Sequence, residues 1–223
     1  AYKFYSQAVL KILKKYIPII EQASIDEFYL DLTGCKNLYG DLFNFTWKLK
    51  KHLEATLKLP LSIGMATNKH IAKVASTLAK PSSLLAVIPG QEKTFLSQLS
   101  VSHIQGIGKQ TLKTLNERGI KTINQLAAIP IEDISKLLGK WGIALHLKAN
   151  GNGNTNFIEN RNRKSISAER TFANDTCDKK QLITILGILS EKLGFQLRKE
   201  KWQAKCICIK LRYSDFKTQT TQI

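Results

Sequence analysis

The sequence predicts an α+β protein made of three parts and a linker, and three patterns support this prediction. Residues 1–90 alternate helical apolar spacing with short runs in which apolar and polar residues alternate, which indicates helices packed on a sheet. Residues 91–150 contain short apolar-periodic segments separated by glycine, which is typical of small helices. An Asn- and Gly-rich stretch at 151–164 predicts a linker, and residues 165–223 return to a mixed strand and helix pattern.

Composition and charge favour a folded protein that binds a polyanion. The 223 residues are 43% hydrophobic, which suffices for packed cores and argues against disorder. Lys and Arg number 34 against 17 Asp and Glu, and this excess favours nucleic acid over an anionic membrane as the partner. The sequence has no apolar run long enough for a bilayer and no secretory leader. It begins at Ala1 within a helical pattern, so we expect a piece of a longer protein.

The four cysteines indicate a cytoplasmic protein with reduced thiols. Their positions contain no C-x-x-C spacing and have no matching histidine cluster, which argues against a zinc site. Cys206 and Cys208 lie two residues apart in an apolar run, so we expect both to serve as small hydrophobic residues of a strand.

Helices and strands are expected to alternate in the first part. The expected helices cover 2–16, 42–57 and 69–78, and the expected strands cover 27–32, 61–66 and 84–88. In the second helix, Lys48, Lys50 and Lys51 are expected to lie away from the apolar side. Thr67 or Asn68 is expected to cap the third helix, because each offers a side-chain oxygen to the first turn.

Two adjacent carboxylates, Asp26 and Glu27, stand where the strand at 27–32 begins. Grouping carboxylates beside a core face is costly unless a cation neutralises them. Carboxylate oxygens suit Mg²⁺, which prefers one or two carboxylates together with substrate phosphates. A charged turn before an edge strand is the alternative for an Asp-Glu pair taken alone.

The surrounding string SIDEFYLDLTG, residues 24–34, resembles the palm motif of the Y-family (translesion) DNA polymerases, most closely the DNA polymerase IV branch. Its Ser-x-Asp-Glu-x-x-Leu-Asp pattern is matched throughout. The resemblance implies that Asp26 and Glu27 are catalytic and hold Mg²⁺, with two ions expected in the intact enzyme. It also implies a partial palm with a ferredoxin-like sheet at 1–90.

A second string, IGMATNKHIAKVASTLAKP at residues 63–81, resembles the second signature of the same family. In the family the lysine before the proline contacts the incoming triphosphate, so the resemblance implies nucleotide binding by Lys80. Lys69 and Lys73 are interpreted as surface or auxiliary charges, and Leu78 is expected to face inward.

Residues 104–109, with the letters IQGIGK, predict the turn of a helix-hairpin-helix. Gly106 and Gly108 let backbone N–H groups approach a DNA phosphate, and Lys109 adds a charge. A plain tight turn between packed helices is the alternative. The resemblance implies that this region, 91–150, is the thumb. Two short helices are expected over 137–149, with Trp141 as a core anchor.

The string RKSISAERTF at residues 163–172 resembles the opening of the family's little finger, and it implies DNA contacts from Lys164, Ser165 and Arg170. A strand is expected at 165–172, a helix at 179–199 and a strand at 204–213. Residues 165–223 are therefore interpreted as a partial little finger.

The resemblance implies an error-prone DNA-directed DNA polymerase that extends primers past damaged template. The family's first metal-binding aspartate, its fingers and the end of its little finger have no counterpart in these 223 residues, so we expect this chain alone to be inactive. Primer-template DNA and deoxynucleoside triphosphates are the implied partners of a monomer, and sliding-clamp binding stays open. A non-catalytic DNA-binding fragment is the alternative. A nucleotidyl cyclase is disfavoured because it predicts neither hairpin thumb nor basic module.

Overall fold

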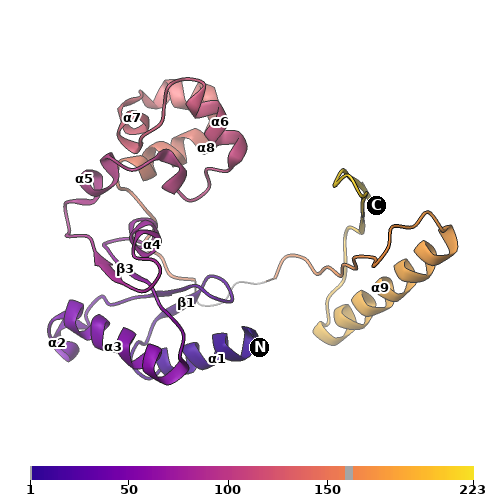
Figure 1. Cartoon of the computed structure of the whole chain (residues 1–223), viewed down its shortest axis with the longest axis horizontal. Helices are drawn as coiled ribbons and strands as arrows, with labels where there is room; N and C mark the ends of the chain where they lie inside the picture. The colour runs from indigo at the N-terminus through magenta and orange to yellow at the C-terminus, as the bar shows by residue number, and fades with distance from the viewer. Residues whose placement is uncertain (1, 159–162) are drawn as a thin grey trace. The chain divides into compact units, whose positions relative to one another are not determined.

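The computed structural model describes residues 2–158 and 163–223, which fall into two compact units, 1–160 and 161–223 (Figure 1). The mixture of helices and strands confirms the expected α+β class. The elements of the first unit are α1 (Tyr2–Leu13), β1 (Ile20–Gln22), β2 (Phe28–Leu30), α2 (Lys36–Tyr39), α3 (Leu42–Leu57), β3 (Ile63–Met65), α4 (Lys69–Leu78), β4 (Leu84–Ala86), α5 (Glu92–Ser97), the 3₁₀ turn η1 (Val101–His103), α6 (Lys109–Asn116), α7 (Ile123–Ala128) and α8 (Ile131–Ala149). None of the helices in residues 2–158 and 163–223 combines the length and the apolar character that crossing a bilayer requires.

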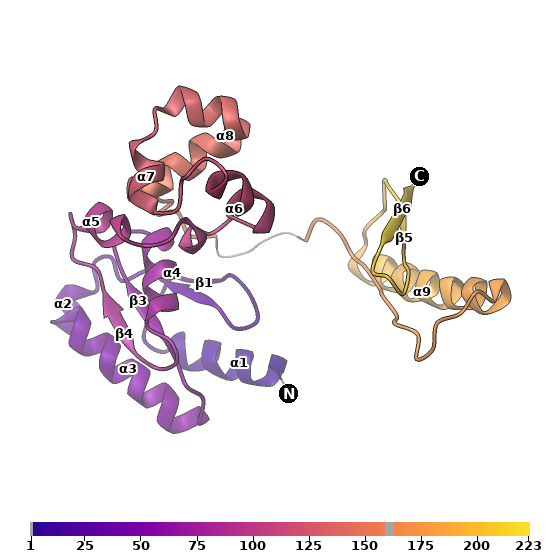
Figure 2. The same cartoon turned by 45° about the horizontal axis from the view of Figure 1, so that its top comes forward.

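Helices α1 and α3 lie side by side and support the antiparallel hairpin β1–β2 (Figure 2). Their contact is apolar: Val9 and Leu13 of α1 and Leu49 and Leu53 of α3 are all buried. The side chain of Asp41 caps α3 by accepting from the Asn44 N–H at 2.9 Å. The helical spacing of the apolar residues therefore predicted the packing face of α3 correctly.

Lys50 was expected to point away from the apolar face of α3, but it does not. Lys50 is completely buried, and its Nζ donates to Glu54 Oε1 at 2.5 Å and to Ser82 Oγ at 3.0 Å. A buried ammonium is tolerated only when it is paired and hydrogen-bonded, and both conditions hold here. The expectation that Lys50 lies outside was wrong because its partner carboxylate follows four residues later on the same helix.

Strands β3 and β4 form a parallel pair, joined by α4. Asn68 is the cap of α4, since its Oδ1 accepts from the Ile71 N–H at 3.1 Å. A Cβ at Gly64 would collide with the backbone of Ala72 in α4, so glycine permits this close approach of helix and strand. Leu78, expected to face inward, is 40% exposed at the end of the helix.

The helices from α5 to α8 form a second packed region of the same unit (Figure 1). The buried core shared with α4 contains Leu115, Leu126, Ile134 and Leu145 at 0% exposure, together with other apolar side chains. Helix α8 is interrupted at Gly139, where φ is +64°. Two helical segments were expected over 137–149, but the first begins earlier, at Ile131, and the second covers most of that stretch. Trp141 is 45% exposed, and the expectation of a core anchor was wrong.

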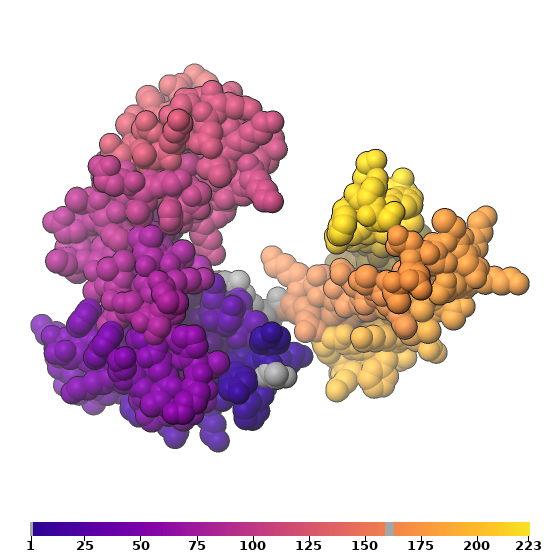
Figure 3. Space-filling model, in the orientation of Figure 1, coloured from indigo at the N-terminus to yellow at the C-terminus, as the bar shows by residue number. Residues whose placement is uncertain are grey.

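The second unit consists of α9 (Lys179–Glu200) and the antiparallel hairpin of β5 (Cys208–Arg212) and β6 (Thr218–Gln222). Figure 3 shows it in orange and yellow. The strand expected at 165–172 is absent from the described structure, because this stretch has no ladder partner there. Cys206 and Cys208 are exposed, so they are not buried as small hydrophobic residues. None of the described residues 163–223 is buried.

Candidate active site and nucleic-acid interface

Asp26 and Glu27 lie in the tight connection between β1 and β2. The Ala23 N–H donates to the Glu27 carbonyl at 3.0 Å, which closes the hairpin. The Ser24 hydroxyl donates to Asp26 Oδ1 at 2.5 Å and accepts from the Asp26 N–H at 3.3 Å. These bonds hold the Asp26 carboxylate in an exposed position beside Glu27.

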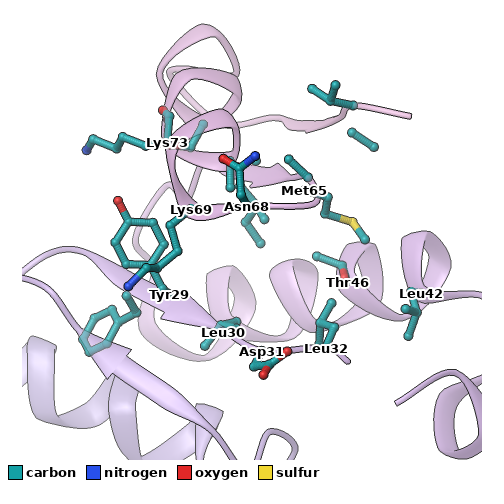
Figure 4. Close-up of a pocket in the computed structure, with 18 of the residues that line it drawn as sticks. Tyr29, Leu30, Asp31, Leu32, Leu42, Thr46, Met65, Asn68, Lys69 and Lys73 are labelled. Atoms are coloured by element: carbon teal, nitrogen blue, oxygen red, sulfur yellow. Dashed lines mark hydrogen bonds between the residues drawn. The ribbon is translucent and has the colours of Figure 1, made fainter. Parts of the chain in front are cut away.

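The two carboxylates line a cavity of about 740 Å³ in the first unit. Its walls come from β2, α3, β3 and α4, and Asp31 lines it as well (Figure 4). In the described residues, β2 pairs only with β1 and β3 pairs only with β4, so the cavity lies beside two strand edges that no third strand joins. Much of its lining is apolar, including Leu30, Leu49 and Ile63.

Lys73 of α4 supplies a positive charge to this acidic turn. Its Nζ forms an ion pair with Glu27 Oε1, and both side chains are partly exposed. One helical turn earlier, Lys69 lies beside the Tyr29 ring, with Nζ 5.6 Å from the ring centroid (Figure 4). Both lysines therefore belong to the cavity wall. Lys69 was interpreted as a surface or auxiliary charge, and the surface position was wrong because its side chain is only 15% exposed.

Lys69 holds a segment that the sequence predicted as linker. Its Nζ donates to the completely buried Glu21 carboxylate at 2.7 Å and also to the Asn156 carbonyl. The Ile158 N–H donates to the same Glu21 carboxylate at 3.0 Å. A buried carboxylate between a lysine and a backbone N–H is well compensated. Residues 151–158 are consequently fastened to β1 and α4.

Lys80 lies beyond the C-terminal end of α4, on the exposed surface, and is not among the residues that line the cavity. Its neighbourhood is firmly anchored, since Ser82 donates to Glu54 Oε1 at 2.5 Å. Burial alone would raise the pKa of Glu54, but hydrogen bonds from Lys50, Ser82 and the Leu61 N–H outweigh it and lower the pKa to about 2.

The turn at 104–108 precedes α6 and is mostly exposed. The Ile107 N–H donates to the Ile104 carbonyl at 3.0 Å, and Gly106 between them has φ of +106°. Gly108 is the N-cap residue of α6, which begins at Lys109. Gly106, Gly108 and Lys109 therefore lie together on one exposed turn at the start of α6.

Lys164, Ser165 and Arg170 lie in the second unit, where all three are exposed in an extended stretch before α9. Arg163 is held by Glu200, with Nη1 and Oε1 3.3 Å apart. The described residues of the chain contain no group of three or more His, Cys, Asp or Glu side chains arranged to hold a metal ion.

Sequence reasoning missed several residues that organise these regions. Glu21 gave a signal, because it is an acidic residue that directly follows the apolar Ile19 and Ile20. Lys148 also gave one, since a separation of seven residues places it on the same helical face as Trp141, which was expected only as a core anchor. No sequence signal distinguished residues 151–158 from an open linker.

Comparisons with known proteins match two segments of the chain to one family. Residues 1–77 match the impB/mucB/samB family, and residues 163–223 match the C-terminal domain of the same family, so the matches cover more than half of the chain. The chain is 38% identical to a DNA polymerase IV of Dehalococcoides mccartyi over 99% of its own length and 57% of that protein. It is 34% identical to a DNA polymerase IV of Streptococcus pneumoniae, covering 98% of this chain and 62% of the relative.

Solved structures show the same fold. A Y-family DNA polymerase chimera of Dbh and Dpo4 superposes with a TM-score of 0.83 at 26% identity, over 100% of this chain and 64% of the other. The insertion ternary complex of Dbh DNA polymerase gives a TM-score of 0.66 at 26% identity, with the same coverage. The chain thus spans less than two thirds of these proteins. The matched segments, the relatives and the shared fold show that this chain belongs to the impB/mucB/samB family, the Y-family DNA polymerases.

Proposed function

We propose that this chain is part of a template-directed DNA polymerase of the translesion type, which extends primers past damaged template. The observation that carries the proposal is the β1–β2 hairpin, which contributes Asp26 and Glu27 to the lining of a cavity also lined by Lys69 and Lys73. Acidic groups suited to metal ions and basic groups suited to phosphates thus share one wall.

The donor set fits Mg²⁺ in part. Asp26 and Glu27 offer hard carboxylate oxygens, and the ion pair between Glu27 and Lys73 shows that this position already binds a positive charge. When bound, two such ions would activate the primer 3′-hydroxyl and steady the leaving pyrophosphate. Asp31, on the same cavity wall, is a further nearby carboxylate. Two adjacent carboxylates do not suffice for two ions, so the proposal includes a further ligand from the rest of the protein.

The remaining roles follow the division into parts. We assign residues 1–90 to the palm, 91–150 to the thumb, 151–164 to the connection and 165–223 to the little finger. Lys80 would contact the triphosphate of the incoming nucleotide. The exposed turn at 104–108, with Gly106, Gly108 and Lys109, would bind the sugar-phosphate backbone without reading sequence. Lys164, Ser165 and Arg170 would contact the template backbone.

Primer-extension assays test this proposal. In a longer protein that contains this chain, Asp26→Asn and Glu27→Gln should each lower synthesis by about 10³-fold or more, because each removes a charged metal ligand. Asp133→Asn is the matched control, since Asp133 is an exposed acid of α8 whose ion pair is with Lys136. Full synthesis by the double amide variant would overturn the proposal. We expect no synthesis from the 223-residue chain alone.

A non-catalytic DNA-binding fragment is the second candidate, favoured by the small number of acidic groups that the described residues gather around the cavity. It predicts duplex binding that weakens steeply with salt, without nucleotide incorporation even when the rest of the protein is present. The two candidates therefore differ in the longer protein and agree for this chain alone.

A further inference from the structure

The conformation of the hairpin turn depends on the orientation of one peptide group. The turn is closed by a hydrogen bond from the Ile107 N–H to the Ile104 carbonyl, and its third residue, Gly106, has positive φ. In the commonest turn type the third residue has negative φ; positive φ there means that the central peptide has the opposite, flipped orientation. That peptide joins Gln105 to Gly106. Because a trans peptide is planar, its carbonyl and its N–H point in opposite directions. A group that binds the Gln105 carbonyl therefore also fixes the direction of the Gly106 N–H.

Lys148 of α8 holds that carbonyl. Its Nζ donates to the Gln105 oxygen at 2.8 Å, across 43 residues of sequence. The bond favours the flipped orientation, since the opposite orientation would turn the N–H toward the ammonium. The Gly106 N–H is consequently directed away from Lys148. Lys148 is half-buried, and this burial lowers the pKa of its ammonium.

Trp141 also packs against this turn. A Cβ at Gly106 would lie only 2.8 Å from Cη2 of the Trp141 ring, so the ring packs directly on the glycine. Lys148 Nζ lies 5.4 Å from the centroid of the same ring, a cation–π distance. The break at Gly139 starts a new helical segment just before Trp141, and the tryptophan and the lysine lie nearly two turns apart on it.

We propose that Trp141 and Lys148 are positioning residues that hold the turn at 104–108 in its phosphate-binding conformation. This inference rests on the proposed DNA contact of the hairpin. Neither side chain touches the phosphate; Lys148 acts through the Gln105 carbonyl and Trp141 acts through Gly106. A turn fixed before binding spares the DNA complex the entropic cost of ordering it, which increases affinity.

Duplex binding by the 223-residue chain, followed by fluorescence anisotropy over a range of salt concentrations, tests this inference. Lys148→Met and Trp141→Leu should each weaken binding about 3- to 10-fold, the equivalent of one lost hydrogen bond. Because neither residue neutralises a phosphate, the slope of log affinity against log salt should stay unchanged. Lys109→Ala should lower affinity and also reduce the slope by about 0.9, as expected for a direct contact. Lys148→Arg, which keeps a donor, should restore most of the binding.

Two comparisons decide the outcome. Lys140→Met is the matched control, since it removes an exposed lysine from the same helical segment and should not change affinity beyond what its charge accounts for. If Lys109→Ala has no effect on affinity or slope, the proposed DNA contact of the hairpin is wrong. If Lys109→Ala behaves as expected while Lys148→Met and Trp141→Leu match Lys140→Met, the positioning role is wrong. A reduced slope for Lys148→Met would also overturn it, because Lys148 would then contact phosphate itself.

A measurement on the amide groups covers the case in which a variant folds poorly. In the unaltered chain, the Gly106 amide resonance should shift on addition of duplex, and that of Gly119, at the other end of α6, should not. In Trp141→Phe, which keeps an aromatic ring, the Gly106 shift should persist with reduced size. An unshifted Gly106 amide in the unaltered chain at saturating duplex would contradict the inference.

Discussion

The helices of the two units have the same spacing of apolar residues, but the two units differ in how far these side chains are buried. In residues 2–158, helices with apolar residues at three- and four-residue spacing pack into two cores, with side chains such as Leu126 and Leu145 at 0% exposure. Helix α9 in residues 163–223 has the same spacing, yet it has no buried side chain. Ile183 and Phe195 on this helix are 68% and 65% exposed.

This difference shows that hydrophobic periodicity predicts an element without predicting what covers it. The spacing is a property of the helix itself, whereas burial requires a second apolar surface at the right distance. Stability should therefore concentrate in the first unit, and similar substitutions should cost more there than in the second unit.

The largest difference in stability between the two units is expected when an apolar side chain is shortened to alanine. Leu126→Ala removes a completely buried side chain and should cost about 2–5 kcal/mol in the free energy of unfolding, from lost burial and the cavity that remains. Ile183→Ala in α9 is the control and should cost under about 1 kcal/mol, since its side chain already lies in water. Urea unfolding of both variants measures the difference, and equal costs would contradict the uneven distribution of stability.

The next effect concerns the buried ion pair of the first unit. Glu54→Gln leaves the Lys50 ammonium buried without a counter-charge and should cost about 3 kcal/mol at pH 7. The folded-state pKa of Glu54 is about 2, below its ordinary value of 4.5. Its contribution is therefore present above pH 4.5 and is lost as pH falls toward 2, so the cost of the substitution should shrink over that window.

Urea unfolding at pH 7 and at pH 3 measures this change. Glu117→Gln is the matched control, because Glu117 also lies four residues after a lysine on a helix but is 59% exposed. It should change stability by no more than about 0.5 kcal/mol at either pH. A similar cost for both substitutions at pH 7 would show that burial of Lys50 does not matter.

Much of the fold was predictable from the sequence because its signals are local. The bounds of α3 and α4 follow from periodicity, from the capping residues Asp41 and Asn68, and from Pro60 after α3. The acidic turn and the glycine turn were predictable as local strings of letters. The acidic turn lies within the β1–β2 hairpin and the glycine turn lies in an exposed loop before α6. Predicting either of them required no knowledge of contacts between distant residues.

Long-range contacts were not predictable in the same way. The Lys148 bond to the Gln105 carbonyl joins an ordinary helical lysine to a backbone atom that has no sequence signature. The same holds for the segment at 151–158, whose anchor is a buried glutamate more than a hundred residues earlier. The expected strand at 165–172 failed for the related reason that a strand needs a partner, which alternation alone does not supply.

A smaller effect is expected from His70 of α4, which is 5% exposed. Burial, with help from the Lys148 charge, lowers its pKa from 6.5 to about 4. The unfolded chain takes up a proton below pH 6.5 and the folded chain does not, so stability should fall as pH drops from 6.5 toward 4, by about 2 kcal/mol. His70→Leu should remove most of this loss in urea unfolding at pH 7 and 4.5, whereas His52→Leu, at an exposed position, should leave it in place.

The smallest effect should come from the same Glu→Gln change in the second unit. Glu200 accepts from Arg163 at 3.3 Å and from Gln196 at 3.0 Å, but the arginine is 52% exposed and the glutamate 33% exposed. Water screens such a pair, so Glu200→Gln should change the stability of α9 by under about 1 kcal/mol, and high salt should abolish the difference. Amide hydrogen exchange within α9 at low and high salt measures it. A cost near that of Glu54→Gln would mean that the second unit is buried in solution, and the contrast between the two units would fail.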